Sequence, residues 1–255
     1  MASRKAEKEQ RRAERERAEA EEATHQRRAR ALALGGGAAA LAIIVVVVLI
    51  VVSQSGDGEG GDPGNVAGTD EITAELGGLE QSGFVLGDPD APVTIVEYGD
   101  LQCPACAAFS ESVIPEIIET QVRPGNAKLE FRNFLIIGPE SDTAARAALA
   151  ASEQDRYWNF VELFYANQGQ ENSGYVTDEF LGEIAAASGV PDIDQWSSDR
   201  DLQRWDERLT DVQGQAADRG LTGTPSIVVE GPGGVEVLGT PESLEQIDQA
   251  VQAVS

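Results

Sequence analysis

The stretch that decides the fold is Val93-Thr94-Ile95-Val96-Glu97-Tyr98-Gly99-Asp100-Leu101-Gln102-Cys103-Pro104-Ala105-Cys106. Residues 93–98 form a run rich in β-branched side chains, which predicts a buried strand. A helix is then expected to open at Cys103, because Pro104 suits the first helical position, where its missing N–H is not needed. The helix should continue to Val122 and kink at Pro115.

Cys103 and Cys106 are the only two cysteines of the chain. At this spacing on a helix they lie one turn apart, within the Cα separation of roughly 4.4–6.8 Å that a disulfide tolerates. The helix dipole and the free backbone N–H groups at the helix start favour the thiolate of Cys103, which makes it the attacking sulfur. Cys106, one turn further in, is placed to resolve a mixed disulfide. The pair therefore predicts a redox-active dithiol.

Two other interpretations of the cysteine pair are weaker. A zinc site needs about four ligands, whereas the chain has no further cysteine and its only histidine, His25, lies on the far side of a predicted membrane span. A purely structural disulfide is disfavoured because so short a loop restrains the unfolded chain very little. The sequence gives no sign of a metal, a nucleotide or an organic cofactor.

The rest of the chain predicts an α/β fold interrupted by a block of helices. The expected elements are a strand at 128–137, helices at 141–154, 155–168, 177–188 and 199–219, a hairpin of strands at 225–229 and 235–238, and a last helix with Thr240 as its N-cap, followed by Pro241 and Glu242. Without the helical block, a small sandwich of βαβ followed by ββα remains.

The N-terminal third predicts a membrane anchor. Residues 31–52 carry no charge, and at about 1.5 Å per residue a helix of this length crosses the roughly 30 Å hydrocarbon core. Arginines precede this span and acidic residues follow it, so residues 1–30 should be a cytoplasmic flank and everything after Ser53 should lie outside. Cleavage as a signal peptide is the alternative, but no Ala-x-Ala-like site follows. Residues 53–82, rich in Gly and acidic residues, predict a flexible tether to a domain at 83–255.

Charge excludes one class of partner. The chain has a net charge of -25, and after residue 30 it holds 9 basic against 37 acidic residues. Such a surface repels phosphate backbones, so no nucleic acid is expected as a partner.

Two motifs resemble the DsbA-like branch of the thioredoxin superfamily. The first is the stretch from Gly87 to Cys106, which is similar to that family's entry into its active-site helix. The second is Gly220-Leu221-Thr222-Gly223-Thr224-Pro225-Ser226, similar to its Gly-x-x-Gly-Thr-Pro signature before a strand. The resemblance covers about residues 84–255 and implies a thioredoxin fold with a helical insertion at about 139–219, here preceded by one transmembrane helix.

The resemblance also implies roles for five residues. Cys103 matches the solvent-facing nucleophile and Cys106 the resolving thiol. Pro225 matches a cis-proline that faces the cysteine pair and, with the backbone of Thr224, holds an extended peptide. Glu97 matches a buried acid that exchanges a proton with Cys106; the alternative is a glutamate at a strand end that reaches solvent.

The expected function is oxidation of cysteine pairs in exported polypeptides, outside the cytoplasm, with reoxidation by a membrane partner of the DsbB or vitamin K epoxide reductase type. Pro104-Ala105 lacks the histidine that strongly oxidising members carry beside the second cysteine, so the direction of catalysis is less fixed than its type. A reductase or isomerase with the same pair is the first alternative. A chaperone-like binding module with incidental cysteines is the second.

Overall fold

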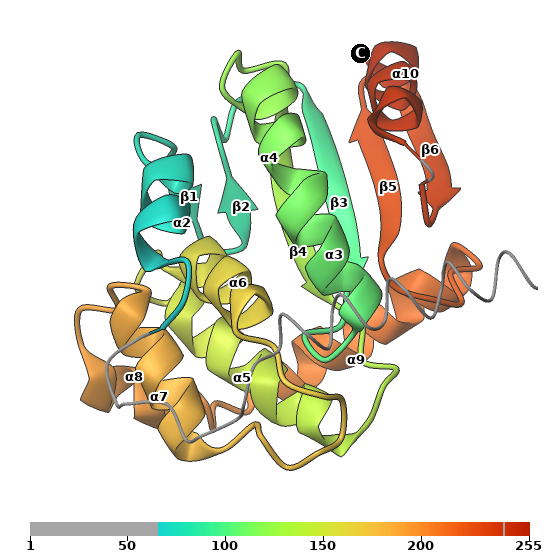
Figure 1. The fold of residues 1–255 in the computed structure, drawn as a ribbon. Helices are drawn as coiled ribbons and strands as arrows, with labels where there is room; N and C mark the ends of the chain where they lie inside the picture. The colour runs from blue at the N-terminus through green and yellow to red at the C-terminus, as the bar shows by residue number, and fades with distance from the viewer. Residues whose placement is uncertain (1–65, 242) are drawn as a thin grey trace, which may run out of the picture. The chain divides into compact units, whose positions relative to one another are not determined.

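The computed structural model describes residues 66–255 apart from residue 242 (Figure 1). The predicted cytoplasmic flank, the predicted span at 31–52 and the first part of the predicted tether lie outside these residues. Among the helices of the described part, none is long and apolar enough to cross a bilayer.

A mixed sheet forms the centre of the domain, with strand order β1-β2-β4-β3-β5-β6. Strand β3 runs parallel to β4 and antiparallel to β5, which makes it the central strand. The strands are β1 (Gln81–Ser82), β2 (Val85–Leu86), β3 (Val93–Gly99), β4 (Ala127–Asn133), β5 (Ser226–Gly231) and β6 (Gly234–Gly239). Strand β3 confirms the strand predicted at 93–98, and β5 with β6 confirms the predicted hairpin.

Side chains of β3 alternate between two buried faces of the sheet. Ile95 belongs to the large core, which includes the active-site helix, whereas Val96 and Tyr98 belong to a smaller core. The smaller core also contains Val212 of helix α9 (Arg204–Asp218). By this alternation Glu97 points to the same face as Ile95. The sheet therefore directs Glu97 toward the cysteines and Tyr98 away from them.

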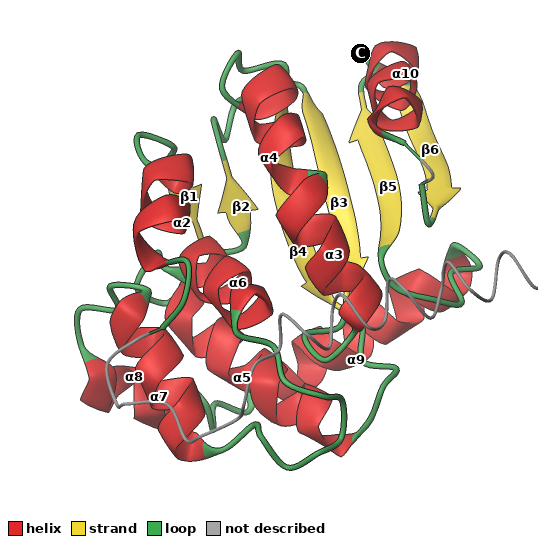
Figure 2. Cartoon of the chain, viewed as in Figure 1, coloured by secondary structure: helices red, strands yellow, loops and turns green. Residues whose placement is uncertain are grey.

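The chain from Pro104 to Val122 forms three consecutive helical segments instead of one kinked helix. They are α3 (Pro104–Ser112), α4 (Ile114–Ile117) and the π-helix η1 (Ile118–Val122). The break at Val113 is consistent with the kink predicted at Pro115, because a proline in the first turn of α4 has no N–H to bond back to the preceding turn. In Figure 2, α3 and α4 lie in front of β3 and β4.

The predicted helical insertion is confirmed, with one more helix than expected. It comprises α5 (Pro139–Ser152), α6 (Tyr157–Ala166), α7 (Asp178–Ala187), α8 (Ile193–Asp199) and α9. The helix predicted at 199–219 begins only at Arg204, and α8 was not predicted. Helix α8 buries only one residue, Trp196, so its sequence has no apolar periodicity that would predict a helix. Its one local signal is the N-cap Asp192, whose side chain accepts a hydrogen bond from the backbone N–H of Gln195 (2.9 Å).

Three further predicted boundaries were wrong. Residues 69–76, inside the predicted tether, form helix α2, whose Leu76 is buried in the large core. The last helix, α10 (Leu244–Val254), has Ser243 and not Thr240 as its N-cap, because the Thr240 hydroxyl donates instead to the carbonyl of Pro225 (2.8 Å). Strand β4 ends at Asn133 and not at 137.

Candidate active site

Cys103 is the N-cap of α3, as the sequence predicted. Its backbone is extended (φ -78°, ψ 119°), and its carbonyl accepts hydrogen bonds from the N–H groups of Cys106 and Ala107, both at 3.1 Å. Its own N–H donates to the carbonyl of Asp100 (2.9 Å). Both cysteines are free thiols. The structure thus places the reduced pair at a helix start, one turn apart.

The two thiols have opposite acidities. A hydrogen bond from the Cys106 thiol, supported by Thr224 and by the N–H groups of Ala105 and Cys106, lowers the pKa of Cys103 to about 6 against the opposing effect of burial. Burial, followed by the hydrogen bond to Cys103 and the charge of Glu97, raises the pKa of Cys106. Cys103 is 6% exposed and Cys106 is 0% exposed. At neutral pH Cys103 is largely a thiolate, whereas Cys106, the more deeply buried of the two, is a thiol.

The second sequence motif lies against the first. The peptide bond between Thr224 and Pro225 is cis, in agreement with the resemblance. The Sγ of Cys103 lies 3.5 Å from the carbonyl oxygen of Thr224, to which Cys103 donates when it is protonated. Pro225 is buried, and its carbonyl is held by the Thr240 hydroxyl. The sheet pairing of β3 with β5 therefore brings the two motifs together at one end of the central strands.

Glu97 is buried, which rules out the alternative of a strand-end side chain in solvent. Only 1% of its surface is exposed, and its Oε1 has no hydrogen-bond partner among the described residues. Burial raises the pKa of Glu97 well above its ordinary value, and the charges of Glu162 and Cys103 raise it further. Its charge in turn raises the pKa of Cys106, so the carboxyl group and the buried thiol interact.

The helical insertion holds the loop that precedes Cys103, which the sequence did not reveal. The Tyr165 hydroxyl donates to the carbonyl of Asp100 (3.2 Å). The Gln168 side chain donates to the carbonyls of Leu101 (2.7 Å) and Cys103 (3.2 Å). Both Tyr165 and Gln168 come from α6 or the turn after it, so the insertion fixes the approach to the active-site helix.

The carboxylate of Asp100 organises the same loop from inside. It accepts hydrogen bonds from the backbone N–H groups of Gln102 (2.9 Å), Ile136 (2.8 Å) and Ile137 (2.9 Å). These contacts explain why the strand predicted to reach 137 ends early: the N–H groups of Ile136 and Ile137 bond to a side chain. Asp100 was missed because an acid after a strand usually signals an exposed turn.

A further buried acid, Glu162 on α6, also escaped the sequence analysis. The Ser110 hydroxyl on α3 donates to its Oε2, and burial raises the pKa of Glu162 to about 8, against the lowering effect of this hydrogen bond. A signal was present in the sequence, since Glu162 is the one charged residue in the run Tyr157-Trp158-Asn159-Phe160-Val161-Glu162-Leu163-Phe164-Tyr165.

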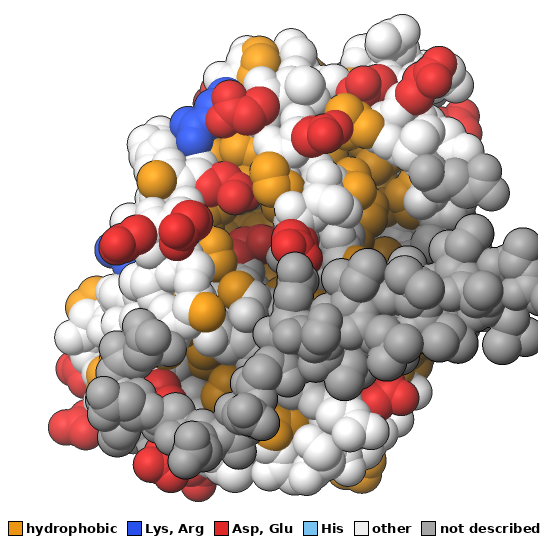
Figure 3. All heavy atoms as spheres, in the orientation of Figure 1, with side chains coloured by type: hydrophobic (Ala, Val, Ile, Leu, Met, Phe, Trp, Pro, Cys, Tyr) orange, Lys and Arg blue, Asp and Glu red, His pale blue; other side chains and the backbone are white. Residues whose placement is uncertain are grey.

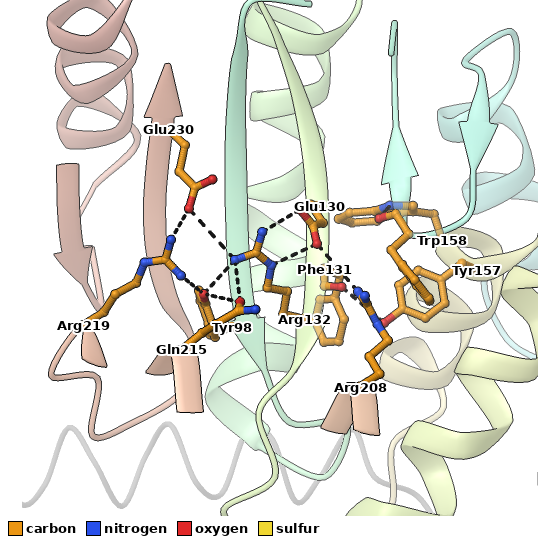
Figure 4. A network of polar contacts seen from close by, with 11 residues as sticks. Tyr98, Glu130, Phe131, Arg132, Tyr157, Trp158, Arg208, Gln215, Arg219 and Glu230 are labelled. Carbon is orange, nitrogen blue, oxygen red and sulfur yellow. Dashed lines mark hydrogen bonds and ion pairs between the residues drawn. The ribbon is translucent and has the colours of Figure 1, made fainter. Parts of the chain in front are cut away.

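The opposite face of the sheet carries a separate polar network (Figure 4). The Tyr98 hydroxyl accepts hydrogen bonds from Arg132 (2.8 Å) and Arg219, Arg132 forms an ion pair with Glu130 (2.8 Å), and Arg219 forms one with Glu230. A hollow of about 380 Å³ lies beside it, lined in part by Arg204, Arg208 and Asp211. Arg132 lies on β4, and Arg219 directly follows α9. Because these two arginines contact Tyr98 of β3 and the carboxylates of Glu130 on β4 and Glu230 on β5, the network joins β3, β4, β5 and α9.

A dithiol of unequal acidity at a helix start, facing a cis-proline loop on a thioredoxin-like sheet, is the arrangement of a thiol-disulfide oxidoreductase. Comparison with known proteins agrees. A family model described as Thioredoxin matches residues 80–253. A probable disulfide bond formation protein D of Bacillus cereus is 34% identical over 150 residues, which cover 57% of this chain and 69% of that protein.

Solved structures give the same result. The crystal structure of oxidised BdbD from Bacillus subtilis matches with a TM-score of 0.59 at 25% identity, over 68% of this chain and 94% of that one. A thioredoxin-like oxidoreductase from Silicibacter pomeroyi DSS-3 matches with a TM-score of 0.55 at 28% identity, over 66% and 89%. The chain belongs to the thioredoxin family, as a DsbA-like thiol-disulfide oxidoreductase.

Proposed function

We propose that this protein is a membrane-anchored oxidase that introduces disulfides into exported polypeptides outside the cytoplasm. The proposal rests on the dithiol at the start of α3, whose Cys103 Sγ lies 3.5 Å from the carbonyl oxygen of Thr224 before the cis-proline, and the lowered pKa of Cys103 supports its direction. A stabilised thiolate favours the reduced enzyme, and an enzyme whose reduced form is favoured has an oxidising disulfide. The names of relatives such as the disulfide bond formation protein D of Bacillus cereus support the same direction.

The reaction begins with the Cys103–Cys106 disulfide. A substrate thiolate attacks Cys103 Sγ, the bond between the two enzyme sulfurs breaks, and its electron pair goes to Cys106. The second substrate thiolate attacks the substrate sulfur of the mixed disulfide and releases Cys103 as a thiolate. Two electrons pass from the substrate to the enzyme; of the two substrate protons, one ends on Cys106 and one in solvent.

Glu97 would supply the proton for Cys106. Burial raises the pKa of Cys106, so this sulfur needs a proton when the enzyme disulfide breaks. Glu97 is a buried carboxyl group with a raised pKa that interacts with Cys106. Solvent then returns a proton to Glu97. Thr224 and Pro225 would hold the substrate in extended form, with backbone groups of Thr224 beside Cys103.

The anchor would keep the enzyme beside its oxidant. The uncharged run at 31–52 would span the membrane, residues 1–30 would lie in the cytoplasm, and a tether from 53 would lead to the catalytic domain. A quinone-linked membrane protein of the DsbB or vitamin K epoxide reductase type would reoxidise the dithiol, and shared anchoring would raise the effective concentration of the two.

Figure 3 shows many Asp and Glu side chains on the face drawn, which agrees with a partner other than nucleic acid.

The redox potential of the purified full-length protein tests the direction. Titration against glutathione, with thiol labelling as the readout, should give a value closer to the roughly -120 mV of strong oxidants than to the roughly -270 mV of thioredoxin. A value near that of thioredoxin would favour the reductase alternative instead. The absence of any reversible couple would leave only the binding module.

Trapping tests the assignment of the two sulfurs. Cys106→Ser should accumulate mixed disulfides with exported proteins, because the resolving thiol is gone, whereas Cys103→Ser should accumulate none. Equal trapping by the two variants would contradict the assignment of Cys103 as the attacking sulfur.

A further inference from the structure

Two buried carboxyl groups lie beneath the active-site helix, although the proposed reaction uses only one. Glu97 comes from β3 and Glu162 from α6, and neither is more than 5% exposed. Ser110, one turn beyond Cys106 on α3, donates its hydroxyl hydrogen to Glu162 Oε2. The helix that carries the resolving thiol therefore also holds the second carboxyl group.

Both carboxyl groups lie against α3: Glu97 acts on Cys106, and Glu162 is hydrogen-bonded to Ser110 one turn further along the same helix. Burial and the charge of Glu162 are the two largest causes that raise the pKa of Glu97. Burial also raises the pKa of Glu162, to about 8. Several titratable or polar groups on the surrounding elements interact electrostatically with Glu97 or with Glu162. They are Cys103, Cys106 and Ser110 on or at the start of α3, Glu75 on α2, and Tyr157 and Tyr165 on α6. They are acids, thiols and hydroxyls, and the only charge that they bring is negative.

The ionisation of Glu162 affects the ionisation of Glu97. Near neutral pH Glu162 is mostly uncharged and adds no repulsion. As the pH rises past about 8, Glu162 loses its proton and becomes negatively charged. A second buried negative charge beside it is then strongly disfavoured, so Glu97 keeps its proton to a higher pH than it would alone.

We propose that Glu162, oriented by Ser110, is a positioning residue that sets the upper pH limit at which Glu97 still holds the proton for Cys106. This inference rests on the proposed role of Glu97. In the step concerned, a substrate thiolate bonds to Cys103 Sγ, the enzyme disulfide breaks, and the proton of Glu97 passes to Cys106. Glu162 neither gains nor loses an atom in that step; its charge decides whether Glu97 is protonated when the step begins.

The test is the pH profile for reduction of the oxidised full-length protein by a dithiol peptide, between about pH 6 and pH 10. The basic limb of this profile should report the loss of the proton from Glu97. In Glu162→Gln the limb should move to lower pH by roughly one unit, the scale on which a nearby charge acts. The amide oxygen of glutamine still accepts the Ser110 hydrogen bond, so packing is preserved.

Two matched variants sharpen the test. Ser110→Ala removes a hydrogen bond that lowers the pKa of Glu162, so the charge of Glu162 arises at higher pH and the limb should move in the same direction by less. Glu179→Gln removes an exposed carboxylate from the same helical insertion and should leave the limb in place. If Glu162→Gln does not fold, an unmoved limb in Ser110→Ala overturns the inference.

The double variant separates this inference from the proposed function. Glu97→Gln should remove the basic limb, and adding Glu162→Gln to it should cause no further shift. If Glu97→Gln removes the limb but Glu162→Gln alone does not move it, the inference fails and the role of Glu97 stands. If Glu97→Gln leaves the profile unchanged, the role of Glu97 fails, and the inference fails with it.

Discussion

The chemistry of the site depends on where each of two identical side chains lies along one helix. Cys103 precedes the first turn, where backbone N–H groups stabilise its negative charge, and Cys106 lies inside the turn, away from solvent. The hydrogen bond between them adds to the difference, since the thiol of Cys106 donates to the sulfur of Cys103. One thiol stabilises its partner's charge and in doing so becomes harder to ionise.

The contribution of that hydrogen bond is measurable. The rate of alkylation of reduced Cys103 should rise with pH through a midpoint of about 6, because only the thiolate reacts. Cys106→Ala removes the largest cause of the lowered pKa, so its midpoint should move upward. In Cys106→Ser the hydroxyl can still donate, and its midpoint should stay closer to that of the wild type. Identical midpoints in the Ala and Ser variants would assign the shift to the backbone N–H groups alone.

At the scale of single elements, β3 and the loop after it set the position of the site. Gly99 ends the strand in tight contact: a Cβ there would lie 2.5 Å from Cε2 of Phe131 and 3.1 Å from the hydroxyl oxygen of Tyr165. Phe131 is fully buried and Tyr165 holds the carbonyl of Asp100. Any side chain at residue 99 would therefore collide with two of the residues that surround the approach to Cys103.

Gly99→Ala should lower the free energy of unfolding by about 1–3 kcal/mol, the usual range for overpacking a core. Exchange kinetics should slow as well, because Tyr165 would move with its hydrogen bond to the active-site loop. Gly182→Ala is a matched control in helix α7, where an added Cβ meets nothing within 4 Å; it should stabilise the protein by about 0.5–1 kcal/mol. Urea denaturation measures both. Equal effects of the two substitutions would contradict the packing argument.

Elements with a strong local signal were predictable from the sequence, and those fixed by distant contacts were not. The β-branched run at 93–98 and Pro104 behind Cys103 identify strand and helix within a few residues. Helix α2, the end of β4 and the N-cap of α10 depend on partners far along the chain, such as the core contact of Leu76 and the bond from Thr240 to Pro225. Local propensity does not contain that information.

The same distinction applies to the candidate site. Spacing and motif were enough to single out the two cysteines, Glu97 and the Thr224–Pro225 loop, and the structure brings these residues together. Their catalytic roles stay predictions. Glu162 and Gln168 reach the site only through the packing of the insertion on the sheet, which no motif describes. Asp100 lies within the stretch 93–106, but its bonds to the N–H groups of Ile136 and Ile137 join segments far apart in the sequence.

At the scale of the whole domain, the face of the sheet opposite the cysteines is held by charge. Tyr98 lies at the centre of the network in Figure 4, where its hydroxyl meets arginines from β4 and from the turn after α9. Glu130 on β4 forms an ion pair with Arg132 of the same strand, and Glu230 on β5 forms one with Arg219. The network thus joins elements separated by long stretches of sequence.

Tyr98→Phe should lower the free energy of unfolding by about 1–3 kcal/mol, because two arginines lose a partly buried acceptor. The pKa of Cys103 should not change, since Tyr98 faces the other side of the sheet. Denaturation and thiol titration on the same sample would check both statements. An altered thiol titration would show that the two faces are coupled.

The pairing of β3 with β5 has a consequence for the biogenesis of this protein. Ribosomes synthesise the chain from its N-terminus, so β3, which leads to Cys103, emerges long before β5. The two strands are neighbours in the finished sheet, where Glu97 of β3 pairs with Ile227 of β5. Until the last elements arrive, the central strand has an open edge, and the reactive thiols lack the loop that faces them. A nascent chain of this architecture therefore carries an unguarded dithiol during synthesis, and its own cysteines need protection from the chemistry that the finished protein performs.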